Sequence, residues 1–137
     1  MRAESVPPIL IVDDEPTLRR LMKRTLNAAG LSVVEAANGA EALALCREQE
    51  FGAVISDIRM PVMDGLDLMS HLQEMAPELP VILVSGSDEV GSPRAARALG
   101  AFDFLPKPFD LSTLSQRALS AVGANSDERA SERRAVA

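Results

Sequence analysis

Short apolar runs alternate along the chain with segments in which apolar residues recur every three or four positions. The run Ile9–Val12 and those at 53–57 and 81–84 are almost entirely apolar, which is typical of strands buried on both faces of a parallel sheet. Less regular runs at 31–36 and 101–105 predict two further strands. The pattern therefore predicts five strands in all.

The segments between these runs predict helices. The first begins at Pro16 and ends before Gly30, because proline suits a first helical turn and glycine suits a helix end. The second is capped by Asn38 and Glu41, which have the spacing of a capping box, and continues to Arg47. Apolar residues of the first helix that recur at helical spacing are Leu18, Leu21, Met22, Leu26 and Ala29.

Three more helices follow the third, fourth and fifth strands. The third is predicted at 65–75, and we interpret its methionines as core packing, since Met fills gaps in aliphatic cores. The fourth is short and begins at Pro93 with Ser92 as its N-cap, and the fifth follows Asp110. The third helix is predicted to have Leu68, Met69, Leu72 and Met75 on one face, and the apolar residues that the fifth helix carries are Leu111, Leu114, Ala118 and Val122.

Five strands alternating with five helices predict an α/β fold in which helices cover both faces of a five-stranded parallel sheet. The architecture is a (βα)5 three-layer sandwich. We expect an N-terminal extension at 1–8 and one domain at 9–122. The segment 123–137 is small, polar and charged, so we expect a flexible tail or the start of a linker.

The composition limits the function classes. The 137 residues suit one domain, and no apolar run approaches the roughly 20 residues that a membrane helix needs. The N-terminus lacks the apolar core of a signal peptide, so we expect a cytoplasmic protein with no membrane partner. The net charge of -6 argues against nucleic-acid binding and suits an acidic cluster that binds a cation. A single cysteine, Cys46, excludes an internal disulfide.

Charged and polar residues follow the strands. Because the carboxyl ends of parallel strands meet at one edge of the sheet, Asp13, Asp14, Asp57, Ser85 and Lys107 are predicted to converge there. Carboxylates brought together repel each other unless a cation shares the space. Oxygen ligands of this kind suit Mg2+.

Metals that prefer thiolate or imidazole ligands are excluded from this edge, since Cys46 and His71 fall within helices and far from it. We expect Cys46 in the core and His71 on the surface. Each strand-end residue has a plain explanation, Asp57 as a turn cap for example. Together, an aspartate beside Mg2+, a lysine and a hydroxyl are equipped for attack on phosphorus to give an acyl phosphate.

The chain resembles the receiver domain of bacterial two-component response regulators over about 9–122. The segments that carry the resemblance are Ile11-Val12-Asp13-Asp14-Glu15, Ser56-Asp57-Ile58-Arg59-Met60-Pro61-Val62-Met63-Asp64-Gly65, Val84-Ser85-Gly86 and Phe102-Asp103-Phe104-Leu105-Pro106-Lys107-Pro108-Phe109. The resemblance implies a flavodoxin-like fold with strand order 2-1-3-4-5. It also implies a signalling phosphoacceptor that is no enzyme beyond its own phosphorylation and dephosphorylation.

The resemblance assigns roles to single residues. It makes Asp57 the phosphoacceptor, charged in a Mg2+-dependent step by a histidine kinase or histidine phosphotransfer protein. It implies that the metal is bound directly by Asp14, mainly through water by Asp13, and by the main-chain carbonyl of Arg59. Lys107 would pair with the phosphoryl group, and a cis bond would join it to Pro108.

The resemblance also implies a switch. Ser85 would be drawn towards the phosphoryl group and Phe104 would turn inward, which remodels the face of the fourth helix, fifth strand and fifth helix. A downstream protein would bind that face, and the domain would be a monomer or a weak phosphorylation-dependent dimer. As a hypothesis, the segment 87–98 responds strongly to phosphorylation, because Gly91 and Pro93 loosen the start of its helix.

Other interpretations remain open. Since no output module fits within 123–137, we expect a regulator that acts by contact, or a receiver domain taken from a hybrid kinase or transcription factor. A receiver-like scaffold could act unphosphorylated. An aspartyl-phosphate hydrolase would resemble Asp-x-Asp at the acceptor, where this chain has Arg59. A flavin-binding module is disfavoured because the loop after Val12 is acidic and lacks a phosphate cradle.

Overall fold

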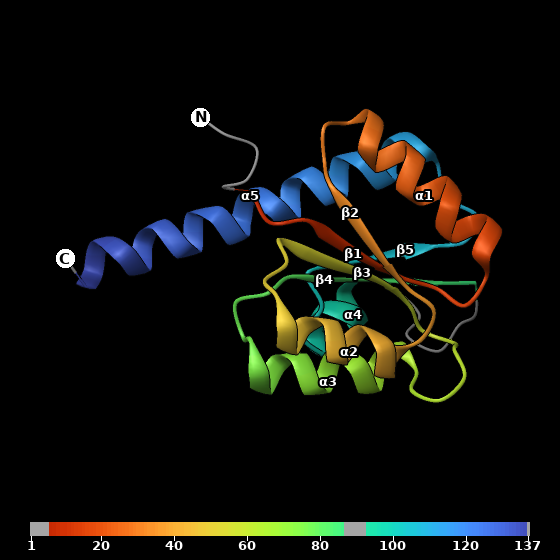
Figure 1. Cartoon of the computed structure of the whole chain (residues 1–137), viewed down its shortest axis with the longest axis horizontal. Coiled ribbons are helices and arrows are strands. Elements are labelled where there is room, and N and C mark those ends of the chain that lie inside the picture. Colours follow the sequence, from red (N-terminus) through yellow and green to blue (C-terminus); the bar gives the residue numbers. More distant parts are fainter. Residues whose placement is uncertain (1–5, 87–92, 137) are drawn as a thin grey trace.

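In the part of the chain that the computed structural model describes, strands and helices alternate, five of each (Figure 1). The structure describes residues 6–86 and 93–136, and only the backbone from 126 onwards. The strands are β1 Ile9–Val12, β2 Val33–Ala36, β3 Ala53–Asp57, β4 Val81–Ser85 and β5 Asp103–Pro106. The helices are α1 Pro16–Ala28, α2 Gly39–Glu48, α3 Gly65–Met75, α4 Pro93–Ala98 and α5 Leu111–Val136.

The five strands form one parallel sheet in the order β2-β1-β3-β4-β5. The predicted α/β class, the parallel sheet and the strand order 2-1-3-4-5 are confirmed. In the register of the sheet Asp57 pairs with Val84, and Ser85 pairs with Pro106. This register brings the ends of β1, β3, β4 and β5 to one edge.

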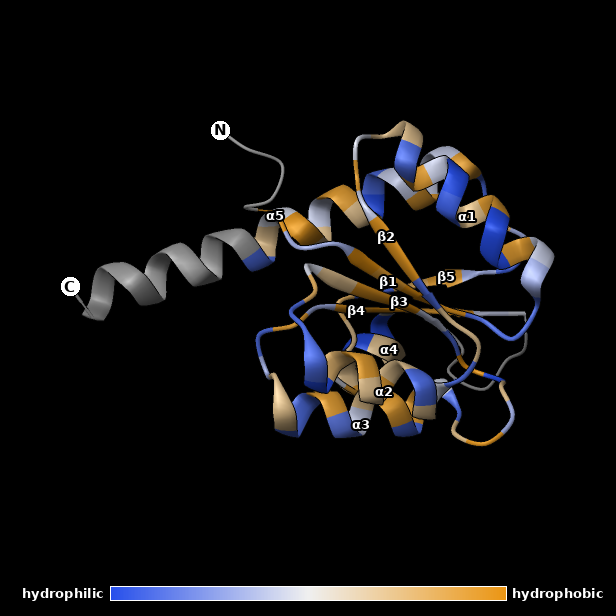
Figure 2. Cartoon of the chain, viewed as in Figure 1, coloured by the Kyte–Doolittle hydropathy of each residue, from blue (hydrophilic) through white to orange (hydrophobic). Residues whose placement is uncertain are grey.

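Two apolar cores lie on opposite faces of the sheet, because alternate residues of each strand point to opposite sides. In β1, Leu10 and Val12 pack with α2, α3 and α4, whereas Ile9 and Ile11 pack with α1 and α5. Figure 1 shows these two groups of helices on either side of the sheet, and Figure 2 shows apolar strands between them. The three-layer sandwich follows from this alternation.

Two strands begin later than predicted, because the residues before them belong to helix ends. Gly30 and Gly100 have φ of 91° and 108°, conformations that glycine adopts readily. The next residues, Leu31 and Ala101, donate their backbone N–H groups back to Leu26 and Ala96 O, each at 3.0 Å. These contacts form Schellman motifs. Both residues are buried, but they are bonded to helices rather than to strands.

The third helix buries most of its predicted face. Leu68, Met69 and Leu72 are buried, whereas Met75 is 40% exposed. The prediction for Met75 is therefore wrong, because it occupies the last position of α3, just before the chain turns away at Ala76. His71 is exposed, and Cys46 packs half-buried against the core on the α2–α3 side.

The last helix is longer than predicted. α5 continues through Val122 to Val136, over the segment 123–136 for which the sequence predicts a flexible tail or the start of a linker (Figure 1). This segment is rich in Ala, Glu and Arg, which are good helix formers, and contains no proline. Asn125 is buried, and its Nδ2 donates to Gly52 O at 3.0 Å. The packed part of α5 therefore extends past Val122.

The short α4 begins at Pro93, as predicted, and has six residues. Its predicted N-cap Ser92, the loosening residue Gly91 and part of the segment 87–98 lie outside the described residues. Among the helices of the described chain, none has the length and hydropathy to cross a membrane.

Candidate functional site: an acidic cluster at the edge of the sheet

The end of β1 presents two aspartates with different surroundings. Asp13 is fully buried, its N–H donates to Ala36 O at 3.1 Å, and its Oδ1 accepts the Glu15 N–H at 2.9 Å. Asp14 is exposed. Glu15 then caps α1, since its Oε1 accepts the N–H groups of Thr17 and Leu18. The turn at the end of β1 thus holds Asp13 inward and leaves Asp14 at the surface.

The end of β3 presents Asp57, which is 8% exposed. The following loop returns tightly, because the Gly65 N–H donates to Ile58 O at 2.8 Å. A Cβ at Gly65 would overlap the Asp57 carbonyl oxygen. The sequence indicated Gly65 as the start of a helix and as the last residue of a segment that carries the resemblance, and neither observation says that Gly65 lies against Asp57.

Lys107 reaches the cluster from the loop after β5. Its Nζ lies 3.0 Å from Asp57 Oδ2 and 3.7 Å from Asp13 Oδ2. Burial lowers the pKa of Lys107, but its hydrogen bond to Asp57 and the charges of Asp13 and Asp57 outweigh burial and raise the pKa overall. The Lys107 side chain therefore stays positively charged at neutral pH. The peptide bond between Lys107 and Pro108 is cis.

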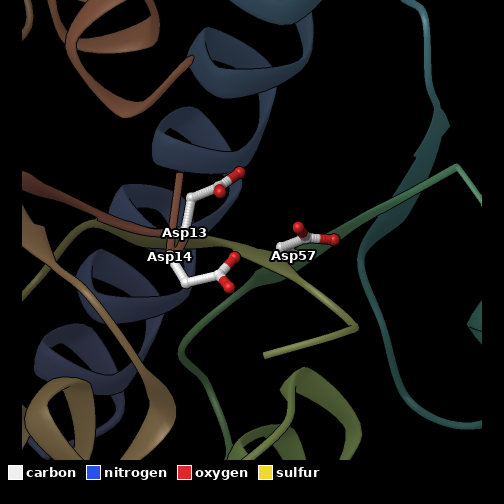
Figure 3. Close-up of side chains that lie close together, drawn as sticks. All are labelled: Asp13, Asp14 and Asp57. Atoms are coloured by element: carbon white, nitrogen blue, oxygen red, sulfur yellow. The ribbon is translucent and has the colours of Figure 1, made fainter. Parts of the chain in front are cut away.

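The three carboxylates come together as the strand order requires. Carboxylate oxygens of Asp13, Asp14 and Asp57 all lie within 4.8 Å of one another, and Figure 3 shows them side by side at the ends of β1 and β3. Burial raises the pKa of Asp13, and the charges of Asp57 and Asp14 add to this, against the opposing effects of the Glu15 hydrogen bond and Lys107. The cluster holds more negative charge than Lys107 alone balances.

A buried oxygen in this cluster is unsatisfied. Asp13 Oδ2 has no hydrogen-bond partner among the described residues. A buried carboxylate oxygen without a donor is costly, and a cation relieves that cost. The donor set is made of oxygens from carboxylates, which is the set that Mg2+ prefers. The residues present therefore fit a hard divalent cation.

The other predicted residues lie around the cluster. Ser85 is buried at the end of β4, and its carbonyl accepts the Lys107 N–H at 2.9 Å. Arg59 is exposed, and together with Asp14 and Asp64 it lines an open depression of about 360 Å³. Phe104 lies on β5, which pairs with β4, and is only 5% exposed.

The ring of Phe104 lies inward in this structure, and its movement on phosphorylation stays a prediction. The resemblance implied an aromatic ring that turns inward on phosphorylation, yet the ring already lies in the core with Leu83 and Ala96. The reason is its register, since Phe104 pairs with Leu83 and points to the same face of the sheet. An outward starting position is thus not the one in this structure.

The sequence matches the family model described as response regulator receiver domain over residues 9–119. The chain belongs to this family. Receiver domains are the signalling phosphoacceptors of two-component systems, and they accept phosphoryl groups from histidine kinases and bind Mg2+ at an acidic pocket. The acidic cluster of this receiver domain lies where such a pocket is expected.

Known proteins support the assignment. The receiver domain is 43% identical over 116 residues to the C4-dicarboxylate transport transcriptional regulatory protein DctD of Rhizobium meliloti, covering 83% of this chain and 25% of DctD. It is 39% identical over 115 residues to the DNA-binding transcriptional regulator NtrC of Escherichia coli, covering 82% and 24% respectively. The chain thus spans about a quarter of the length of these relatives.

Solved structures share the fold. The receiver domain of NtrX from Brucella abortus is 33% identical with a TM-score of 0.78, covering 84% of this chain and 98% of that one. A CheY-like receiver domain protein from Methanospirillum hungatei is 26% identical with a TM-score of 0.82, covering 90% and 98%.

Sequence reasoning missed several residues that support the site. Arg19 of α1 donates from Nη1 to the Asp13 carbonyl oxygen at 2.6 Å. Asp103 at the start of β5 is buried and pairs with Arg97 of α4 and Arg117 of α5. These four residues are charged and have ordinary spacing in the sequence, so only the fold brings each to its partner.

Proposed function

We propose that this receiver domain accepts a phosphoryl group on Asp57 from a histidine kinase or histidine phosphotransfer protein in a Mg2+-dependent phosphorelay. The observation that carries the proposal is the position of Asp57, whose Oδ2 lies 3.0 Å from Lys107 Nζ within a cluster of three carboxylates. A carboxylate so placed is a nucleophile beside a fixed cation, which suits attack on phosphorus.

Asp13, Asp14, Asp57 and the Arg59 carbonyl are the proposed ligands of Mg2+. The bound ion supplies positive charge that stabilises the oxygens of the phosphoryl group during transfer. The unsatisfied Asp13 Oδ2 and the closeness of the three carboxylates support this ligand set.

In the proposed transfer a carboxylate oxygen of Asp57 bonds to phosphorus as the bond between phosphorus and the donor histidine nitrogen breaks. The electron pair of that bond stays with the imidazole, and the acyl phosphate remains on Asp57. Lys107 then pairs with the phosphoryl oxygens, and the Ser85 hydroxyl hydrogen-bonds the same group. Beyond forming and losing this acyl phosphate, the domain has no proposed catalytic role.

The proposed output surface is the α4-β5-α5 face, where a downstream protein would bind. Asp103 supports this choice, since it lies between α4 and α5 and its Oδ2 accepts from Arg117 Nη1 at 3.0 Å. A shift of Ser85 or Phe104 on phosphorylation would therefore move β5, and with it the contacts of Asp103 with α4 and α5. Phe104 is the proposed switch aromatic, starting from its inward position.

The proposed setting is a cytoplasmic chain that acts by protein contact as a monomer or weak phosphorylation-dependent dimer, without direct nucleic-acid or membrane binding. The proposed domain spans 9–122, to which the packing of Asn125 adds the next turn of α5. A second proposal is that this domain is the receiver part of a longer transcription factor, since DctD and NtrC are about four times the matched length.

The test is incubation with acetyl phosphate and Mg2+ followed by intact mass measurement. We expect one added phosphoryl group in the wild type, and none when Mg2+ is chelated. Asp57→Asn is the matched variant and should gain nothing. A domain that acts as an unphosphorylated scaffold would give no adduct, and a hydrolase would release phosphate continuously from many substrates. Either result would overturn the proposal.

A further inference from the structure

We propose that Arg19 is a positioning residue for the metal ligand Asp13, and that Glu35 holds Arg19 in place for this task. This inference rests on the proposed function, because it concerns the same acidic cluster. It adds two residues to that site, neither of which touches the reacting atoms.

Arg19 contacts the turn that carries the acid pair. It lies in the second turn of α1, its side chain is 19% exposed, and Nη1 donates to the Asp13 carbonyl oxygen at 2.6 Å. The neighbouring Arg20 is exposed. Of these two adjacent arginines, Arg19 is thus the one directed at the site.

Glu35 fixes the guanidinium from the other side. Its Oε1 lies 2.9 Å from Arg19 Nε, and its Oε2 lies 3.5 Å from Lys23 Nζ. In the sheet Glu35 of β2 pairs with Ile11, two residues before Asp13. Arg19 therefore bridges β2 and the turn after β1, with both ends of its guanidinium held.

Given these contacts, Oδ2 is the carboxylate oxygen of Asp13 that can bind a metal ion. Its N–H donates to Ala36 O, its Oδ1 accepts the Glu15 N–H and its carbonyl accepts from Arg19. Its Oδ2 has no hydrogen-bond partner among the described residues and lies 3.7 Å from the Lys107 ammonium. The residue is fully buried, so each anchor limits how the carboxylate can turn. Partners that orient a metal ligand in this way typically change metal affinity by about 10- to 100-fold when removed.

The positive charge of Arg19 and its role as an anchor predict opposite effects of its loss on the affinity for Mg2+. A cation near a metal site weakens metal binding, so losing it by charge alone would tighten the binding of Mg2+. Loss of an anchor would weaken that binding. The sign of the change in affinity therefore separates the two roles.

The experiment is a Mg2+ titration of the unphosphorylated full chain, followed by amide shifts in NMR spectra. For Arg19→Gln we expect the Kd for Mg2+ to rise about tenfold. For Glu35→Ala we expect a smaller rise, about threefold, since Arg19 stays but loses its support. The matched control Arg20→Gln removes the same charge from the exposed neighbour and should leave the Kd within about twofold.

A second readout needs no metal. The Glu15 amide donates to Asp13 Oδ1, so it should exchange with solvent faster in Arg19→Gln than in Arg20→Gln. A merely structural role for Arg19 would lower the melting temperature and leave both the Kd and this exchange rate unchanged. Should Arg19→Gln fail to fold, the exchange rate of the Glu15 amide in Glu35→Ala carries the test, because loss of the Glu35 charge alone would also weaken Mg2+ binding.

The Mg2+ titration distinguishes failure of the proposed function from failure of this inference alone. If the wild type does not bind Mg2+, the proposed function and this inference are both overturned. If the wild type binds Mg2+ and Arg19→Gln binds it equally well or more tightly, this inference alone is overturned.

Discussion

Gly65 lies so close to Asp57 that a methyl group on its α-carbon would overlap the Asp57 main-chain oxygen. The same methyl group would lie 3.0 Å from the α-carbon of Ile58. These neighbours are backbone atoms of Asp57 and Ile58, which cannot rotate away as a side chain could. The first turn of α3 is therefore packed directly against the end of β3. The position of Asp57 requires a glycine at residue 65, because a side chain there would overlap the Asp57 backbone.

Gly65→Ala should lower the free energy of unfolding by about 2–3 kcal/mol, because the added Cβ forces β3 and α3 apart. Denaturant unfolding measures this change. Gly123→Ala is the matched control, since a Cβ there meets nothing within 4 Å and alanine favours a helix. It should be neutral or stabilising by up to about 1 kcal/mol. An equally stable Gly65→Ala variant would contradict the close packing.

Val62 has a backbone conformation that its side chain disfavours. Its φ is 73°, and the side chain is 83% exposed, so burial does not repay the strain. Asparagine tolerates the left-handed region better, and Val62→Asn should raise the free energy of unfolding by about 1 kcal/mol. Chemical denaturation tests this. Val6→Asn, at another exposed valine, should give no such gain.

Asp13→Asn should stabilise the Mg2+-free protein at neutral pH. The pKa of Asp13 is raised in the fold, so protonation favours the folded state, and that stability is lost as pH rises through the folded pKa. Above it the wild type carries a buried charge that asparagine lacks. We expect a gain of about 1 kcal/mol, or roughly 3–5 °C in melting temperature.

The control for Asp13 is Mg2+ itself. At about ten times its Kd the ion should stabilise the wild type by about 1.4 kcal/mol and should hardly affect Asp13→Asn. The difference in stability between the two proteins should also shrink as pH falls below the folded pKa of Asp13. A variant less stable than the wild type without Mg2+ would contradict the assignment of an uncompensated carboxylate.

Cys46 should react slowly with alkylating reagents at pH 8. Burial raises its pKa to about 11, so only about one thiol in a thousand is ionised at that pH. Time courses of iodoacetamide labelling, followed by mass, test this. Protein unfolded in guanidinium chloride is the control and should react at the rate of an ordinary thiol. Equal rates in the two states would show that Cys46 is not shielded.

The site was predictable from the sequence as far as it depends on topology. Once the apolar runs indicate parallel strands, Asp13, Asp57 and Lys107 must meet at one edge, whatever the details of the loops. Leu31 and Ala101 were assigned to strands because apolarity indicates burial and does not say to which element the backbone N–H is bonded. Gly30 indicated the end of a helix, but a glycine there does not by itself say that the residue after it bonds back to the helix.

The rest depends on side-chain geometry. Nothing in the spacing of Arg19 and Glu35 indicates that they meet, because that contact requires α1 to cross β2 at one particular register. The continuation of α5 past Val122 was missed because a polar segment was interpreted as flexible, although its residues favour a helix. The buried ring of Phe104 reflects the face of β5 on which it lies, which the resemblance alone did not give.

We propose that Asp57 carries the phosphoryl group. The most direct measurement is to phosphorylate the protein with acetyl phosphate and Mg2+, reduce the acyl phosphate with borohydride, and locate the reduced residue by peptide mass mapping. We predict conversion of Asp57 to homoserine, with Asp13, Asp14 and Asp64 unchanged. Reduction at another carboxylate, or no reduced residue in protein that has been treated with donor and Mg2+, would contradict the account.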